Sequence, residues 1–253
     1  MKTLSIANQK GGVGKSTETV HLAYAALEAG LRVLLVDMDV QGNSSMMFEA
    51  PESMEAGLVA SELFTAELSE VQPQHVTDKL SVIRADLGLL DVDKAGEPVI
   101  AYPSKALRQY NKDYDLCLID CPPLLGIRLM GALTASDYVL TPVQVDKFTL
   151  NGVADLMQTI QVIRTQGFNP RLRHMGWLPS RINGKSKKEK EALENLRAMY
   201  GAAILPHMLM ERAAVKTAIE NNIPVWEKVR GSSHEKAAKE WRDACQYILG
   251  EVL

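Results

Sequence analysis

Cysteine is scarce in this 253-residue sequence, and long apolar runs are missing. The three cysteines, Cys117, Cys121 and Cys245, are too few and too unevenly spaced for a disulfide framework, which favours a reducing compartment. No segment reaches the roughly 18 uninterrupted apolar residues of a membrane-spanning helix, and the N-terminus leads into a strand without a signal-peptide pattern. These absences predict a cytoplasmic protein.

Several catalytic signatures are also missing. The five histidines form no H-E-x-x-H pattern, and no G-x-S-x-G segment is present. The sequence therefore gives no support for a zinc protease or for a hydrolase with a serine nucleophile. Because 46% of the residues are hydrophobic, the chain can bury one large core, and we predict a single domain over residues 1–253.

A glycine-rich loop near the N-terminus carries the strongest signal. The segment 10–17 reads KGGVGKST and lies between an apolar strand at 3–8 and a helix at about 16–29, which Gly30 should end. The ordinary phosphate-loop pattern G-x-x-x-x-G-K-[ST] needs glycine where Gln9 stands, whereas the variant K-G-G-x-G-K-[ST] fits in full. The order of strand, loop and helix predicts a polyphosphate site of this variant kind.

The backbone of this loop is suited to anions. We expect its three glycines to take positive φ angles, so that several N–H groups face a polyphosphate at the positive end of the following helix. The predicted phosphate-binding residues are Gly11, Gly12, Val13, Gly14, Lys15, Ser16 and Thr17.

The side chains of the loop complete a nucleotide site. Lys15 would reach the β- and γ-phosphates, Ser16 would offer its hydroxyl to Mg²⁺, and Thr17 could bond the α-phosphate. Lys10 precedes the curl of the loop, so we expect it to serve the nucleotide of a partner subunit, as an arginine finger supplied in trans does.

Two other strands are predicted to end in carboxylates. The apolar run from residue 31 ends in Asp37 and Asp39, and the run 114–120 ends in Asp120. Because parallel strands deliver their carboxyl ends to one crevice, these aspartates should lie beside the loop. Asp120 suits a magnesium site, and Asp39 could orient the attacking water with Asp37 in support. Strand-end aspartates also cap helices and turns, and that structural role stays open.

The remaining periodicity indicates an α/β fold. Further strands are expected near 80–84, 116–120, 138–143 and 175–179, with helices near 150–166 and 235–253, and short helices between 41 and 75. We predict a doubly wound, mostly parallel sheet flanked by helices.

Three segments together resemble one known family. The loop 10–17, the segment DMDVQGN at 37–43 and the segment LIDCPP at 118–123 resemble the deviant-Walker ATPases, specifically the ParA-type DNA partition ATPases of the ParA/MinD superfamily. The stretch 135–144, followed by Gly152, is similar to the family's next strand and loop, so the resemblance covers most of the chain.

This resemblance implies a P-loop NTPase fold, with ATP or ADP and Mg²⁺ as cofactors. It also implies slow ATP hydrolysis, an ATP-bound sandwich homodimer, non-specific DNA binding on the nucleoid and a ParB-like centromere-binding partner that stimulates hydrolysis. Lys10 would be the signature lysine, Lys15 and Ser16 would bind phosphates and Mg²⁺, Asp39 would hold the catalytic water, and Asp120 would belong to the metal site.

Four further positions are interpreted through the same resemblance. Asn183 and Pro206 are candidate adenine contacts, although a loop asparagine and a strand-ending proline explain them equally well. Val40 departs from the family's usual proline, and Gly131 stands where asparagine is common.

Charge is distributed unevenly along the chain. Residues 1–160 contain 12 Lys and Arg against 21 Asp and Glu, whereas residues 161–253 contain 16 against 10. This asymmetry suggests a polyanion-binding surface in the C-terminal third, although charge runs are often only solvated faces. With the family resemblance, the predicted DNA-binding residues are Arg181, Lys185, Lys187, Lys188, Lys190, Lys216, Lys228 and Arg230.

Two other function classes compete with DNA partition. A MinD-like ATPase that positions itself on membranes would need a C-terminal amphipathic membrane helix, yet the end of this chain is typical of a helix packed on the core. An iron–sulfur reductase would need two suitably placed cysteines per subunit, of which Cys121 is the candidate beside Asp120.

Overall fold

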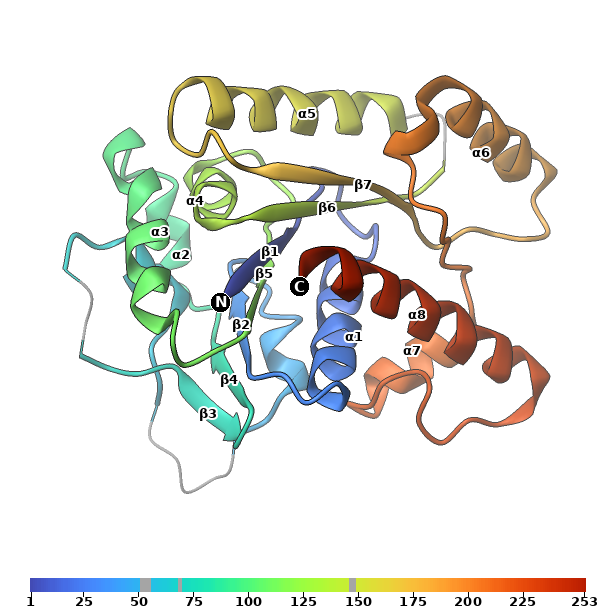
Figure 1. Cartoon of the computed structure of the whole chain (residues 1–253), viewed down its shortest axis with the longest axis horizontal. Coiled ribbons are helices and arrows are strands. Elements are labelled where there is room, and N and C mark those ends of the chain that lie inside the picture. Colours follow the sequence, from blue (N-terminus) through green and yellow to red (C-terminus); the bar gives the residue numbers. More distant parts are fainter. Residues whose placement is uncertain (51–55, 68–69, 146–148) are drawn as a thin grey trace.

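The computed structural model describes residues 1–50, 56–67, 70–145 and 149–253, without the side chains of 149–153. One seven-stranded sheet runs through the molecule, with helices on both faces (Figure 1). Its strands are β1 (Lys2–Ile6), β2 (Val33–Asp37), β3 (Gln74–Thr77), β4 (Leu80–Ile83), β5 (Leu116–Asp120), β6 (Tyr138–Val143) and β7 (Arg173–Pro179). Their spatial order is β3-β4-β2-β5-β1-β6-β7, and all neighbours are parallel except β3 and β4.

Eight α-helices and five short 3₁₀ helices lie in the described residues. The α-helices are α1 (Lys15–Glu28), α2 (Leu89–Val92), α3 (Tyr102–Leu107), α4 (Ile127–Ala135), α5 (Thr149–Thr165), α6 (Lys187–Tyr200), α7 (Ala213–Glu220) and α8 (Gly231–Val252). The 3₁₀ helices are η1 (Ser45–Met47), η2 (Ala60–Phe64), η3 (Glu97–Ala101), η4 (Arg108–Tyr110) and η5 (Gly201–Ala203). None of the helices in the described part of the chain is long and apolar enough to cross a membrane.

Two apolar layers hold the sheet between its helices. One layer joins α1 and α8 to the sheet through side chains such as Leu22, Trp241 and Ile248. The other layer lies under α3, α4 and α5, with Leu129 and Ile160 among its members. The central strands β2 and β5 are buried along their whole length, because both of their faces are covered. The predicted doubly wound fold is confirmed.

The sheet brings three strand ends to one edge. In the parallel register, Asp37 of β2 is aligned with Asp120 of β5, and Asp120 is aligned with Ile6 at the end of β1. The chain leaves β1 at this point and enters the glycine-rich loop. Asp37, Asp120 and the loop are therefore neighbours because equal strand lengths bring them level at the carboxyl edge.

The sequence did not predict every element. Strand β3 is a short antiparallel edge strand whose residues alternate between half-buried and exposed, and its sequence QHVT is too polar to stand out. Helix α8 begins at Gly231 rather than Glu235. Steric crowding explains the glycine at position 131, because a Cβ atom there would lie 2.6 Å from the ring of Phe64 and 3.1 Å from Pro103. Asparagine would fit at this position only if Phe64 and Pro103 shifted.

Candidate active site

The glycine-rich loop is curled as a phosphate-binding loop. Gly12 and Gly14 take the predicted positive φ angles of 74° and 110°. Gly11 does not, so that part of the prediction was wrong. The start of the loop is fixed by Asn8, whose side chain accepts a hydrogen bond from the Lys10 N–H at 2.8 Å and donates one to the Pro142 carbonyl at 2.6 Å.

Lys15 is the buried cation of the site. Its side chain is only 6% exposed, and its ammonium donates to the Lys10 carbonyl at 3.3 Å. Burial lowers the pKa of Lys15, while the charges of Asp120 and other nearby acids oppose that change. A buried ammonium at the first turn of α1 is well placed to meet a polyphosphate.

Asp120 is a buried carboxylate without a hydrogen-bond partner among the described residues. Burial, together with the charge of Asp37, raises the pKa of Asp120 to about 7, although the hydroxyls of Ser16 and Ser44 and the charge of Lys15 oppose the change. The Ser44 hydroxyl is also buried, and it lies close enough to Asp37 and Asp120 to favour their ionised forms. Unsatisfied buried oxygens are costly, and hard oxygen donors are the ligands that Mg²⁺ prefers.

These donors fit a magnesium ion bound together with a nucleotide. Such an ion usually takes only one or two protein ligands, and phosphate and water supply the others. Accordingly, the described residues contain no group of three or more His, Cys, Asp or Glu side chains that could hold a metal. The predicted pair of Ser16 and Asp120 converges on the same edge, where Ser16 occupies the first turn of α1.

The other two aspartates have distinct positions. Asp37 is fully buried, and its carboxylate accepts from the N–H groups of Asp39 at 3.1 Å and Ser45 at 2.8 Å. Asp39 is half-buried, accepts from the Gln41 N–H and lies at the cavity beside the loop. Asp37 therefore holds the backbone that presents Asp39.

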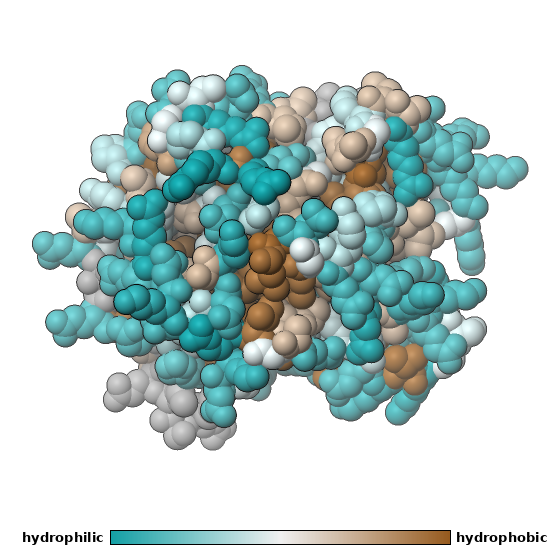
Figure 2. All heavy atoms as spheres, in the orientation of Figure 1, coloured by the Kyte–Doolittle hydropathy of each residue, from teal (hydrophilic) through white to brown (hydrophobic). Residues whose placement is uncertain are grey.

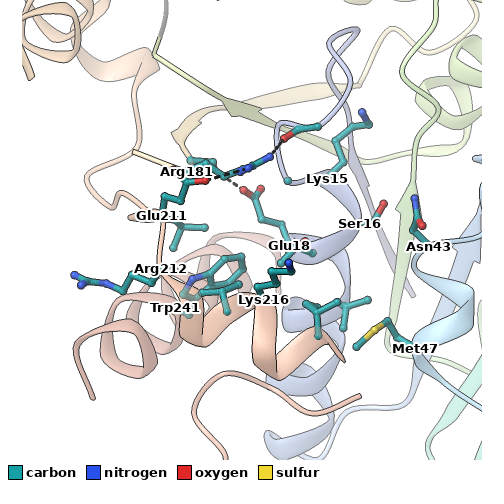
Figure 3. A pocket seen from close by; sticks show the side chains of 18 of the residues that line it. Lys15, Ser16, Glu18, Asn43, Met47, Arg181, Glu211, Arg212, Lys216 and Trp241 are labelled. Carbon is teal, nitrogen blue, oxygen red and sulfur yellow. Dashed lines mark hydrogen bonds and ion pairs between the residues drawn. The ribbon is translucent and has the colours of Figure 1, made fainter. Parts of the chain in front are cut away.

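A cavity of about 640 Å³ adjoins the loop, a volume typical of small-molecule sites. The loop and the first turn of α1 form one wall, and the segment from Leu209 to Ile219 with Trp241 forms another. In Figure 3, Lys15 and Ser16 lie on one side of Glu18, while Arg181 and Glu211 lie on the other. The cavity thus extends from the phosphate-binding residues to a mixed apolar and charged wall.

Glu18 and Arg181 are site residues whose positions the sequence did not reveal. Glu18 is 2% exposed, accepts from the Ser180 hydroxyl and has a pKa raised well above its ordinary value by burial. Arg181 donates to the Gly12 carbonyl at 2.5 Å and pairs with Glu211 at 3.1 Å. A charged residue on the buried face of α1 was the available signal for Glu18; nothing local indicated its partner 162 residues away.

Two expected adenine contacts lie outside this lining. Asn183 is exposed and its carboxamide oxygen accepts from the Lys185 N–H, while Pro206 is exposed before the cavity wall begins at Leu209. Ser180 and Arg181, which precede Asn183 in the sequence, line the cavity instead. Adenine contact by Asn183 and Pro206 stays a prediction.

The predicted DNA-binding residues fall into three places. Four exposed lysines lie at or just before the start of α6, at Lys185, Lys187, Lys188 and Lys190. Lys228 and Arg230 directly precede α8. Lys216 and Arg181 line the cavity, so these two are available to a nucleotide as well as to DNA.

The features named for the two alternative functions are both buried. The apolar side of α8 packs into the core through Trp241, Cys245 and Ile248, and is not a free membrane-binding surface. Cys121 is fully buried, and burial raises the pKa of its thiol to about 12. A cluster shared between subunits would need an accessible thiolate there.

Replacing Asp120 with asparagine should stabilise the protein when nucleotide and metal are absent. The raised pKa of Asp120 means that folding opposes its ionised form, so the substitution should gain about 2 kcal/mol near pH 8. Because the penalty exists only above the ordinary carboxyl pKa, this gain should shrink as the pH falls from about 8 to about 5. Urea unfolding in EDTA measures it.

Asp37→Asn is the matched control. Burial raises the pKa of Asp37 as well, but its carboxylate accepts two backbone N–H groups that oppose the change. An amide there would turn its NH₂ group toward one of these N–H donors, so the gain in stability should be smaller than for Asp120→Asn or replaced by a loss. Lower stability of Asp120→Asn near pH 8 would contradict our reading of a strained buried carboxylate.

Comparison with known proteins agrees with this geometry. The family model described as an AAA domain matches residues 1–174. Protein IncC of Escherichia coli is 34% identical over the whole chain, which covers 70% of IncC. The chromosome-partitioning ATPase Soj of Thermus thermophilus is 36% identical over 81% of this chain and 79% of Soj.

Solved structures show the same fold. A putative plasmid partition protein of Borrelia burgdorferi bound to AMPPNP has a TM-score of 0.79 at 25% identity, covering 99% of each chain. Cobyrinic acid a,c-diamide synthase of Mycobacterium smegmatis, with bound ADP and magnesium, has a TM-score of 0.77 at 25% identity, covering 98% of this chain and 94% of the synthase. The sequence relatives and the loop together show that this chain belongs to the ParA family of partition ATPases.

Proposed function

We propose that this protein is an ATP-driven DNA-partition switch. The main support is that the two lysines of the glycine-rich loop occupy different positions relative to the cavity. Lys15 is buried and lines the cavity, whereas Lys10 is half-buried and lies outside the lining. Lys15 would bind the phosphates of its own subunit, and Lys10 would reach those of a second subunit across a two-fold axis.

The other residues of the carboxyl edge have separate roles. Ser16 and Asp120 would hold Mg²⁺, which supplies charge neutralisation for the phosphates when it is bound. Asp39, presented by Asp37, would orient the water that attacks the γ-phosphate. The solved relatives with AMPPNP, or with ADP and magnesium, support the choice of adenine nucleotide.

DNA binding would use the two basic groups of the C-terminal third, one at α6 and one before α8. Their lysines and arginine would neutralise phosphates, which requires no base-reading element. Dimerisation would join two weakly cationic faces and raise affinity through avidity. We further infer a ParB-like centromere-binding partner that resets the switch at the nucleoid. A membrane-positioning role is the second candidate, although the buried apolar face of α8 disfavours it.

The role of Lys10 can be tested by nucleotide-dependent dimerisation. Light scattering of Asp39→Ala with ATP and Mg²⁺ should show a dimer, and adding Lys10→Ala should leave a monomer that still binds nucleotide. A dimer that survives Lys10→Ala would contradict the proposed exchange of lysines.

Two other variants test the roles of Lys15 and Asp39. Lys15→Ala should lose nucleotide binding, because the buried phosphate-facing cation is gone. Asp39→Ala should slow ATP hydrolysis by about 100-fold or more.

Charge reversal can test the DNA surface. Changing Lys187, Lys188 and Lys190 to Glu should weaken binding to two unrelated duplexes about equally. It should also flatten the slope of log affinity against log salt concentration, by an amount that corresponds to the loss of about three phosphate contacts per protomer. Gel shifts with ATP and with ADP at several salt concentrations measure both effects.

The matched control carries the same charge change at exposed lysines outside the C-terminal third, Lys94, Lys105 and Lys112. It should bind DNA nearly as the parent does. Equal loss in the control would mean that net charge, rather than the surface at α6, governs binding. Equal parental binding with ATP and ADP would remove the nucleotide-dependent part of the proposal.

A further inference from the structure

Two buried or half-buried histidines hold the backbone of Val225 from both sides. The Val225 N–H donates to Nε2 of His21 at 3.1 Å, and the Val225 carbonyl lies 2.7 Å from Nε2 of His234. Val225 itself is completely buried. The segment between α7 and α8 is thereby attached to a side chain of α1, although the two are about 200 residues apart in sequence.

Each ring is held in one tautomer by its second nitrogen. His21 accepts at Nε2, so its Nδ1–H donates to the Thr17 carbonyl at 2.7 Å. His234 accepts the Arg230 N–H at Nδ1, at 3.1 Å, so its Nε2–H donates to Val225. Each ring thus accepts at one nitrogen and donates at the other, and four hydrogen bonds connect Thr17 to Arg230 in series.

Other contacts make this attachment rigid. The His21 ring lies between Trp226 and Trp241, with ring centroids 5.5 Å and 4.3 Å away. One turn further along α1, Tyr24 donates to the Asn222 carbonyl at 2.6 Å, and Glu28 accepts from Trp226 at 2.6 Å. One face of α1 thus contacts the segment through His21, Tyr24 and Glu28, which lie on successive turns of the helix.

The backbone of the segment turns on both sides of Val225. Asn222, just past the C-cap of α7, and Lys228 have positive φ angles of 52° and 49°. Asparagine is common in this conformation after a helix, whereas lysine seldom adopts it. The left-handed turn at Lys228 lies between Val225 and Arg230, so the contacts of α1 and His234 with Val225 lie directly before the turn that leads to the two basic residues.

One end of this connection lies at the cavity, and the other end lies at exposed basic residues. Thr17 lies on the first turn of α1 and lines the cavity, and α7, which leads into the segment, lines the same cavity through Val215, Lys216 and Ile219. Arg230 and Lys228 are exposed basic residues at the other end. A nucleotide in the cavity would therefore contact both elements that hold the segment in place.

We propose that His21 and His234 are positioning residues that couple nucleotide binding at Thr17 and α7 to the placement of Lys228 and Arg230 for a polyanion. This inference rests on the proposed nucleotide-dependent DNA binding and names the route by which the cavity controls one of its two basic groups. Neither histidine lines the cavity, so each would act through Val225 rather than on the nucleotide.

Hydrogen exchange of the full chain tests the coupling directly. In the parent, AMPPNP with Mg²⁺ should slow exchange over residues 222–230 by about 5-fold or more, the lower end of ordinary coupling between sites. His21→Phe keeps a ring between the two tryptophans but removes both hydrogen bonds. It should bind a fluorescent ATP analogue with nearly parental affinity, yet lose the exchange response, and its preference for DNA with ATP over ADP should fall toward one.

A second variant covers the case in which His21→Phe does not fold. His234 is half-buried at the surface, and His234→Phe should lose the response near Arg230 while keeping it near Asn222. His207→Phe is the matched control, since His207 contacts only the Tyr247 ring among the aromatic residues described and should behave as the parent.

The outcomes separate the inference from the proposed function. A parental exchange response in both His21→Phe and His234→Phe, or no response in a parent that binds nucleotide, would overturn the coupling. A normal exchange response in a parent that binds DNA equally with ATP and ADP would keep the coupling and overturn only its use for DNA. Failure of the parent to bind nucleotide would remove the proposed function and the coupling together.

Discussion

The arrangement of this protein depends on buried charges at one edge of a parallel sheet. Asp37 and Asp120 end neighbouring strands in register, and neither carboxylate is exposed to solvent. Lys15 is buried beside them on α1, which begins where the loop after β1 ends. Like charges in such an environment are costly unless a cation or hydrogen-bond donors compensate them. The site is therefore built for ligands that bring their own charges, as a magnesium nucleotide does.

Helix α1 connects this site to the rest of the molecule. Its first turn carries the phosphate-binding residues, while its later turns hold the segment before α8 through hydrogen bonds of His21, Tyr24 and Glu28. The surface in Figure 2 is largely hydrophilic, with an apolar group near the end of α8. Under the proposed coupling, a bound nucleotide would act first on α1 and then on the segment before α8, which carries Lys228 and Arg230.

Much of this could be predicted from sequence because the key residues are tied to local pattern. The strands that precede Asp37 and Asp120 are apolar runs, and the loop 10–17 has glycines where two positive φ angles occur. Parallel topology then brings these segments together without further information. The antiparallel strand β3 lacked such a pattern and was missed.

The parts that could not be predicted depend on side-chain packing between distant segments. Ser180 meets Glu18, Arg181 meets Gly12, and Val225 meets His21, all across more than 160 residues. Likewise, the cavity wall begins at Leu209, three residues after Pro206, and no spacing rule fixes such an offset. Charge asymmetry pointed to the C-terminal third, where the lysines near α6 are exposed, but it could not distinguish them from Arg181, which faces the loop.

We expect the buried carboxyl edge to hold the metal and the phosphates of one ATP. A crystal structure with AMPPNP and Mn²⁺ in place of Mg²⁺ would locate the metal by the anomalous scattering of manganese. Manganese should lie beside Ser16, with Asp120 bound directly or through one water, and the phosphates should lie on the backbone of residues 11–17. Manganese or phosphates located away from Asp120 and the loop would contradict this expectation.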